Sequence, residues 1–331
     1  MTTLVAIKTR DCVVMGCDSL ATDVRPYVNP FKLLEDFFNR KTLKILIDKD
    51  GNPKLDHFAK ILSKSIRMPY NHIPYITKLF NLNPIKIGVM TAGSASIGER
   101  SIKSIVNDFK INIIKERRKN AATTSSVNKV GEKFRQFFQK EYERVFKDLI
   151  YKPDYEFIIG GYGNRDKSPK IFRLNFSNKE QDGKLEEDKY YIVTGGQSDA
   201  IDRIIFGIDN YGYSSIVKRS EDLLEMYYDK IEAAIGGSVS IPKPETYKKD
   251  LKFFDPELNL FNRLNIDYAN FSEQIAIDLV GWLVEIMINA QRFDSSMPTV
   301  GEPIHILLIT KQEMKPITPE TYNFREHCVP I

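Results

Sequence analysis

Residues 2–22, TTLVAIKTRDCVVMGCDSLAT, decide the fold that we expect at the start of this chain. Two apolar runs inside this stretch, residues 2–9 and 12–19, are separated only by Arg10 and Asp11. Two strand-like runs joined by so short a connection are typical of an antiparallel β-hairpin. The sequence therefore predicts a hairpin that starts at the second residue.

The rest of the chain groups its strands and its helices instead of alternating them. Short apolar runs predict strands at 85–93, 155–163, 170–176, 189–196 and 303–311. Apolar side chains at helical spacing predict helices at 96–119, 123–150, 198–208, 220–235 and 272–293. Such an order favours the α+β class with antiparallel sheets. We expect a single domain over residues 1–331, a four-layer αββα sandwich with helix pairs outside two facing sheets.

The composition excludes several classes of protein. Of 331 residues, 42% are hydrophobic and 28% charged, as in ordinary globular chains. A net charge of +4, from 48 basic and 44 acidic residues, is too small to indicate a nucleic-acid partner. Three cysteines cannot build a disulfide framework, and four scattered histidines lack metal-ligand spacing. Since no apolar run approaches membrane-spanning length, we expect a cytoplasmic protein without metal, cofactor or membrane partner.

Thr2 is a candidate nucleophile. Once Met1 is removed, Thr2 carries a hydroxyl and a free α-amine on adjacent carbons. That amine titrates near ~8 and can act as a base close to neutral pH. A threonine activated by its own amine is a recognised design for covalent catalysis. Threonine after an initial methionine is also common without any catalytic meaning, so the interpretation depends on the neighbouring residues.

Asp18 stands at the end of the second strand of the hairpin, across from Thr2. The ordinary role of such an acid is a solvated strand end. A lysine beside it would place positive charge near the Thr2 hydroxyl and ease its deprotonation. Lys60, in FAKILSK, is our candidate for that lysine, and Lys44, in LKILI, is the alternative.

Gly93 closes the strand predicted at 85–93 and precedes a predicted helix. Ser96 and Glu99 have the spacing of a capping box, which indicates that this helix starts there. A glycine in such a place is often only a turn residue. Its N–H could also serve as an oxyanion-hole donor, because no side chain stands in the way.

Together these residues resemble the proteasome β-type subunits of the N-terminal nucleophile hydrolase superfamily. Members of that family begin their mature chain with threonine, contain a hairpin of this length and carry an acid at the position of Asp18. A lysine followed by apolar residues matches KIL at 60–62, and a strand that ends in Ala-Gly matches Ala92-Gly93. AQRFDSS at 290–296 is similar to the family's Arg-Asp-Ser stretch after its long C-terminal helix.

The resemblance implies a threonine-type endopeptidase that forms an ester between Thr2 and the substrate and then releases it with water. In this view the Thr2 amine is the general base, and Lys60 tunes the nucleophile together with Asp18. The catalytic set implied by the family comprises Thr2, Asp18, Lys60, Gly93, Asp294 and Ser296. Asp294 and Ser296 would orient the amine, with Thr299 as the alternative to Ser296.

The chain also departs from the family pattern. Gly196 stands where the family has a serine near the nucleophile, and the hydroxyl of Ser198 is near in the sequence. Residues 24–58, 64–84 and 209–270 exceed a typical subunit and are expected to be insertions that could block ring stacking.

We therefore expect a peptide or an unfolded protein as substrate and a homo-oligomeric assembly, with no ATPase or activator partner identified. One alternative is an inactive proteasome-like subunit that serves only in structure or assembly. Another is a peptide ligase or transferase that passes the same ester to an amine.

Overall fold

The computed structural model describes residues 2–27, 66–147, 153–176, 183–184, 189–235, 264–293 and 298–317. The chain divides into two compact units. Unit 1 comprises residues 1–197 and 268–331, and unit 2 comprises Ser198–Asp267. Unit 2 coincides over most of its length with the segment 209–270 that the sequence indicates as an insertion.

The first sheet of unit 1 contains the predicted N-terminal hairpin. Its strands follow the order β12-β1-β2-β13-β14, and the paired neighbours are antiparallel. They are β1 (Thr3–Lys8), β2 (Cys12–Cys17), β12 (Tyr191–Gly196), β13 (His305–Thr310) and β14 (Met314–Ile317). Leu4 pairs with Cys17, and the turn is closed by the Thr9 hydroxyl, which accepts a hydrogen bond from the N–H of Cys12 at 3.0 Å. The prediction of a hairpin is confirmed.

The second sheet of unit 1 has the order β11-β10-β9-β6-β5 and is also antiparallel. Its strands are β5 (Leu79–Asn81), β6 (Ile87–Gly93), β9 (Tyr155–Gly161), β10 (Lys170–Asn175) and β11 (Gly183–Lys184). A separate two-stranded sheet pairs β3 (Ala21–Tyr27) with β4 (Ile66–Ile73). The segment 64–84, which the sequence analysis treats as an insertion, contains β4 and β5. Although β5 is short, it forms the edge of the second sheet and buries Phe80.

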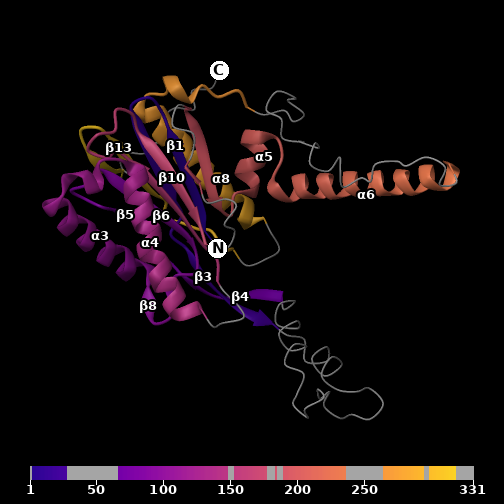
Figure 1. Cartoon of the computed structure of the whole chain (residues 1–331), viewed down its shortest axis with the longest axis horizontal. Coiled ribbons are helices and arrows are strands. Elements are labelled where there is room, and N and C mark those ends of the chain that lie inside the picture. Colours follow the sequence, from indigo (N-terminus) through magenta and orange to yellow (C-terminus); the bar gives the residue numbers. More distant parts are fainter. Residues whose placement is uncertain are drawn as a thin grey trace, which may run out of the picture. The chain divides into compact units, whose positions relative to one another are not determined.

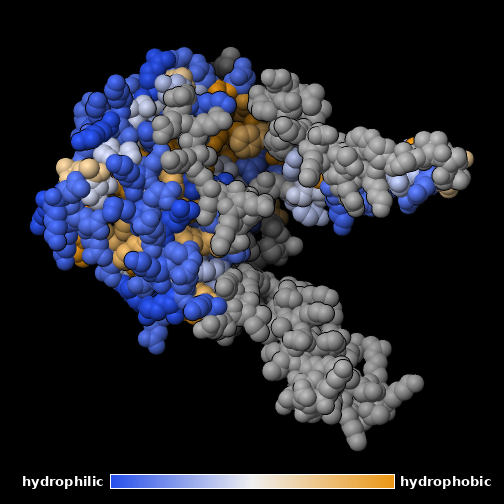
Figure 2. Space-filling model, in the orientation of Figure 1, coloured by the Kyte–Doolittle hydropathy of each residue, from blue (hydrophilic) through white to orange (hydrophobic). Residues whose placement is uncertain are grey.

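Two helices cover one face of the second sheet. They are α3 (Ile102–Lys119) and α4 (Val127–Phe146), joined by the short 3-10 helix η1 (Ala121–Thr124). Their apolar stripes join the sheet in one core, in which Phe134 and Phe138 meet the ring of Phe157 edge-on at centroid distances of 4.9 and 4.6 Å. Figure 1 shows α3 and α4 together on one side of the strands. Their outward surface is mostly hydrophilic (Figure 2), as expected for amphipathic helices.

The capping box expected at Ser96 and Glu99 does not form. Instead β7 (Ser96–Ile97) pairs with β8 (Arg100–Ser101) in a small hairpin, and α3 begins only at Ile102. Its N-cap is Ser101, whose hydroxyl accepts a hydrogen bond from the N–H of Ser104 at 3.2 Å. The spacing of serine and glutamate cannot by itself distinguish a capping box from a turn with Gly98 at a φ of 56°.

The two sheets face each other through a second apolar core. Side chains from both sheets contribute to it, among them Leu4, Met15, Met90, Ile158 and Leu307. The other face of the first sheet is covered by α8 (Glu273–Arg292), which the sequence predicts almost residue for residue. The helix approaches closely, because a Cβ added to Gly16 would lie 2.2 Å from a methyl carbon of Val280. The mixed α+β class with antiparallel sheets is therefore confirmed.

Two helices lie within the described residues of unit 2, 198–235 and 264–267. They are α5 (Asp199–Phe206) and α6 (Asn210–Ile235), and α6 starts ten residues before the predicted boundary at 220. Gly207, with a φ of 79°, ends α5. Asp209 then accepts a hydrogen bond from the N–H of Gly212 at 2.6 Å and pairs with Arg203. The Gly212 N–H and the Arg203 charge lower the pKa of Asp209.

None of the described helices is long and apolar enough to cross a membrane. Nor do the residues with described positions include a cluster of His, Cys, Asp and Glu side chains suited to a metal ion.

Candidate active site

The start of β1 is held by the carboxylate of Asp18. Since Leu4 pairs with Cys17, Thr3 lies opposite Asp18, and its N–H donates to Asp18 Oδ1 at 2.9 Å. Thr2 precedes the strand and is 4% exposed. The hairpin thus brings Asp18 to Thr3, one residue after the candidate nucleophile, whereas the sequence analysis places it across from Thr2.

The cation beside Asp18 is Lys78. Its Nζ lies 2.9 Å from both Asp18 oxygens and 2.5 Å from the carbonyl oxygen of Leu20. Asp18 Oδ2 also accepts hydrogen bonds from the N–H groups of Leu20, at 3.1 Å, and Gly301, at 3.2 Å. Asp18 is fully buried and Lys78 is 4% exposed. Every donor of the ammonium and both carboxylate oxygens are therefore satisfied, as a buried ion pair requires.

The sequence analysis names Lys60 as the lysine beside Asp18, with Lys44 as the alternative. Both lysines lie outside the described residues. Among the described residues the lysine beside Asp18 is Lys78, which the sequence analysis did not name. A signal was present in the sequence: Lys78 is followed by Leu79 and Phe80 and immediately precedes the strand that pairs with β6. It was missed because residues 64–84 were interpreted as an insertion.

Gly93 ends β6 in a conformation that only glycine adopts easily. Its φ is +105°, and a Cβ there would lie 2.1 Å from the carbonyl oxygen of Asp154. The preceding residue, Ala92, packs against Gly196, where an added Cβ would be 3.1 Å from the Ala92 methyl. Because α3 begins at Ile102, Gly93 does not directly precede the helix, contrary to expectation.

Gly196 and Gln197 hold the backbone of Thr2. Gly196 has a φ of +65°, and a Cβ there would lie only 2.0 Å from the Thr2 carbonyl oxygen. The N–H of Gln197 donates to that same oxygen at 2.6 Å, and the Thr3 hydroxyl donates to the Gln197 carbonyl at 2.7 Å. Glycine at 196 is thus required by close backbone approach. The hydroxyl of Ser198 donates to Asp202 within unit 2, at 2.7 Å.

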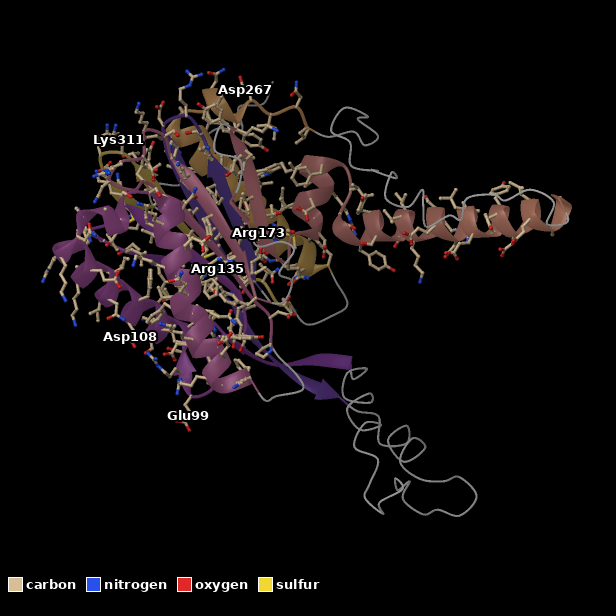
Figure 3. All side chains as sticks on the ribbon, in the orientation of Figure 1. Glu99, Asp108, Arg135, Arg173, Asp267 and Lys311 are labelled. Carbon is tan, nitrogen blue, oxygen red and sulfur yellow. The ribbon has the colours of Figure 1, made fainter. Side chains whose placement is uncertain are left out.

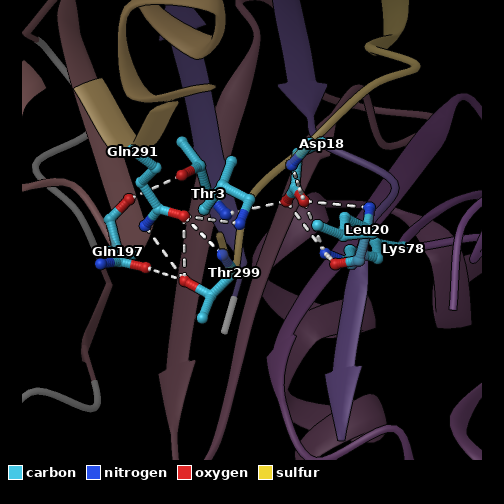
Figure 4. Close-up of polar contacts among 9 residues, drawn as sticks. Thr3, Asp18, Leu20, Lys78, Gln197, Gln291 and Thr299 are labelled. Atoms are coloured by element: carbon cyan, nitrogen blue, oxygen red, sulfur yellow. Dashed lines mark hydrogen bonds and ion pairs between the residues drawn. The ribbon is translucent and has the colours of Figure 1, made fainter. Parts of the chain in front are cut away.

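Thr299 connects this backbone to α8, as Figure 4 shows. Its hydroxyl lies 2.7 Å from Gln197 Oε1 and accepts from Gln291 Nε2 at 3.0 Å. Gln291 Oε1 in turn accepts from the N–H groups of Thr299, at 2.6 Å, and Val300, at 2.8 Å. Asp294 and Ser296 lie outside the described residues. Thr299, the alternative to Ser296, does belong to the network, whereas Gln197 and Gln291 were not anticipated.

His305 and Cys17 also lie close to the ion pair. His305 pairs with Cys17 across β13 and β2. Burial lowers the pKa of His305, Lys78 lowers it further, and Asp18 acts in the opposite direction. Burial and the Asp18 charge raise the pKa of the Cys17 thiol, and the residue is fully buried. A raised pKa disfavours the reactive thiolate form of Cys17.

No family model matches the sequence, and no curated protein is significantly similar to it. The residues of unit 1 fix a threonine backbone from two sides. One side is a buried ion pair, and the other is a network of neutral amides and a hydroxyl.

Proposed function

We propose that this chain is an N-terminal threonine hydrolase that cleaves peptide bonds, in which Thr2 acts after removal of Met1. We further propose that the two sheets with α3, α4 and α8 represent the αββα sandwich of the N-terminal nucleophile superfamily. The observation that carries the proposal is the Asp18–Lys78 pair, which is buried and bonded to the N–H that follows Thr2. A scaffold protein has no physical need for a buried charge pair at that point, because desolvating two charges is costly.

In the proposed reaction the Thr2 amine takes the proton of the Thr2 hydroxyl, and the oxygen attacks the peptide carbonyl carbon. The tetrahedral intermediate collapses as the amine gives its proton to the leaving nitrogen, and an ester to Thr2 remains. Water, deprotonated by the same amine, adds to the ester carbon. Collapse of that second intermediate returns the hydroxyl to Thr2 and releases the acid.

Lys78 and Gly93 have different proposed roles in this reaction. The ammonium of Lys78, held by Asp18 and Leu20, favours the developing alkoxide on Thr2. The N–H of Gly93, at the exposed end of β6, would stabilise the oxyanion. Close contact among Thr2, Gly196 and Ala92 supports a reacting centre at this end of the two sheets.

The test is mass spectrometry after treatment with an epoxyketone, a reagent that needs both a hydroxyl and a free amine on one residue. The expected result is an adduct on an N-terminal Thr2 that is lost in Thr2→Ala and kept in Thr2→Ser. Thr2→Ser is the matched control because it retains both reacting groups. A protein that has lost Met1 and still takes no adduct would contradict the proposal, as would retention of Met1 in the native host.

A further inference from the structure

One charged side chain reaches from the second sheet toward the strand that holds Thr2. Glu156 lies on β9, where side chains alternate between the two faces. Tyr155 and Phe157 join the core under α3 and α4, whereas Ile158 joins the core between the sheets. Glu156 therefore shares the face of Ile158 and points toward the first sheet, although most of that space is filled by apolar side chains.

The Glu156 carboxylate bonds to the backbone of β12. Its Oε2 accepts a hydrogen bond from the N–H of Gly196 at 2.8 Å. It also packs tightly, because a Cβ added to Gly195 would lie 2.8 Å from Oε1 and 3.1 Å from Oε2. Gly195 thus provides the space that the carboxylate occupies, and Gly196 provides the donor.

Arg173 balances the charge of this carboxylate. Its Nη2 lies 2.6 Å from Glu156 Oε1, and the two side chains are 29% and 13% exposed, respectively. Arg173 lies on β10 among the strands, unlike peripheral charged residues such as Glu99 and Asp108 (Figure 3). A partly buried carboxylate is costly without a partner, and the nearby positive charge of Arg173 offsets part of that cost.

We propose that Glu156, supported by Arg173, is a positioning residue for Thr2. Glu156 fixes the Gly196 N–H, and the next N–H of the same turn, that of Gln197, donates to the Thr2 carbonyl at 2.6 Å. The second sheet thereby sets the position of the threonine carried by the first. This inference rests on the proposed function, because it assigns Glu156 a role in that reaction.

The test compares Glu156→Ala, Glu156→Gln and Arg173→Met in the full-length protein. Two quantities are measured well below the unfolding temperature: the rate of epoxyketone modification and hydrogen exchange of the Gly196 and Gln197 amides. Glu116→Ala is the matched control, because it removes an exposed ion pair to Lys133 on the helix face.

In Glu156→Ala we expect modification to slow by about 10- to 100-fold, since a displacement near 1 Å can have an effect of that size. Exchange at Gly196 and Gln197 should rise. Glu156→Gln keeps an acceptor for Gly196 and should recover most of the rate, whereas Arg173→Met should lie between the two. Glu116→Ala should leave both quantities unchanged.

The inference is overturned if Glu156→Ala folds and changes neither quantity, or if Glu156→Gln is as slow as Glu156→Ala. If Glu156→Ala fails to fold, Glu156→Gln and Arg173→Met serve as the test in its place. Unchanged exchange of the Gly196 and Gln197 amides in Arg173→Met would contradict the proposal that Arg173 supports Glu156. A wild-type protein that takes no adduct overturns the proposed function instead. The exchange data would then still show whether Glu156 holds the Gly196–Gln197 turn.

Discussion

The carboxylate of Asp18 lies 2.9 Å, through each of its two oxygens, from the ammonium of Lys78, a residue 60 positions later in the chain. This pair joins the end of β2 to the residue before β5, and so it connects the two sheets at the level of Thr3. Loss of the pair is therefore expected to affect both the stability of unit 1 and the proposed nucleophile, Thr2.

Asp18→Asn should destabilise the protein strongly. The substitution leaves the buried Lys78 ammonium without its counter-charge, and breaking one partner of a buried pair costs about 3–5 kcal/mol. Denaturant unfolding measures the loss in the free energy of unfolding. Glu132→Gln, which removes the charge from an exposed pair to Arg135, is the control and should cost about 0–1 kcal/mol. Equal losses in the two variants would argue against a structural role for the Asp18–Lys78 pair.

Gly196→Ala should abolish the proposed reaction of Thr2. An alanine Cβ would stand 2.0 Å from the Thr2 carbonyl oxygen, so the backbone must move. Gly98→Ala is a matched control because Gly98 also has a positive φ, of 56°, yet an added Cβ would meet nothing closer than 3.5 Å. The control should lose only about 1–2 kcal/mol of stability through backbone strain and keep the epoxyketone adduct. An adduct retained in Gly196→Ala would contradict the close approach.

Thr299→Val should loosen Gln197 without a change in side-chain shape. Removing the hydroxyl leaves Gln197 Oε1 and Gln291 Nε2 without this partner, at a cost of about 1–3 kcal/mol in the free energy of unfolding. Thr124→Val is the control, since the buried Thr124 hydroxyl accepts from Asn164 Nδ2 at 2.9 Å. Both variants should lose stability. Only Thr299→Val should slow epoxyketone modification and increase exchange at the Gln197 N–H.

His305→Gln should make the protein less sensitive to acid. Burial lowers the pKa of His305 in the folded protein, while the unfolded chain titrates near ~6.5. As the pH falls through this value, the unfolded chain binds the proton first, so the wild-type free energy of unfolding decreases. The variant should show a flatter dependence between about pH 7 and pH 5. Above that window the two proteins should have the same slope, and identical profiles within it would contradict a lowered pKa of His305.

Several elements could be predicted from the sequence because their signals are local. The β1–β2 hairpin follows from two apolar runs and a two-residue connection. The helices α4 and α8 follow from apolar side chains spaced by three and four residues, which bury one face whatever their partner is. The position of Asp18 near Thr2 follows from the same hairpin, since strand pairing fixes which residues stand opposite each other.

The residues that hold Thr2 could not be found in this way. Gln197, Gln291 and Lys78 come from three distant segments, and their side-chain types occur widely on protein surfaces. Glu156 is a polar residue in an otherwise apolar strand. Only its hydrogen bond with the Gly196 N–H, seen in the structure, explains why a polar residue stands there. Such contacts follow no periodic pattern in the sequence, because their partners are far apart in the chain and meet only when it folds.

The sequence by itself determined the α+β class, the presence of the N-terminal hairpin and the candidate pair of Thr2 and Asp18. Only the tertiary structure decided that Lys78 is the buried cation, that Gly196 must lack a side chain and that Glu156 bonds to β12 from the opposite sheet. The physical reason is that local periodicity fixes which face of a strand or helix is buried. The identity of a buried polar partner depends instead on which distant groups meet there and satisfy one another.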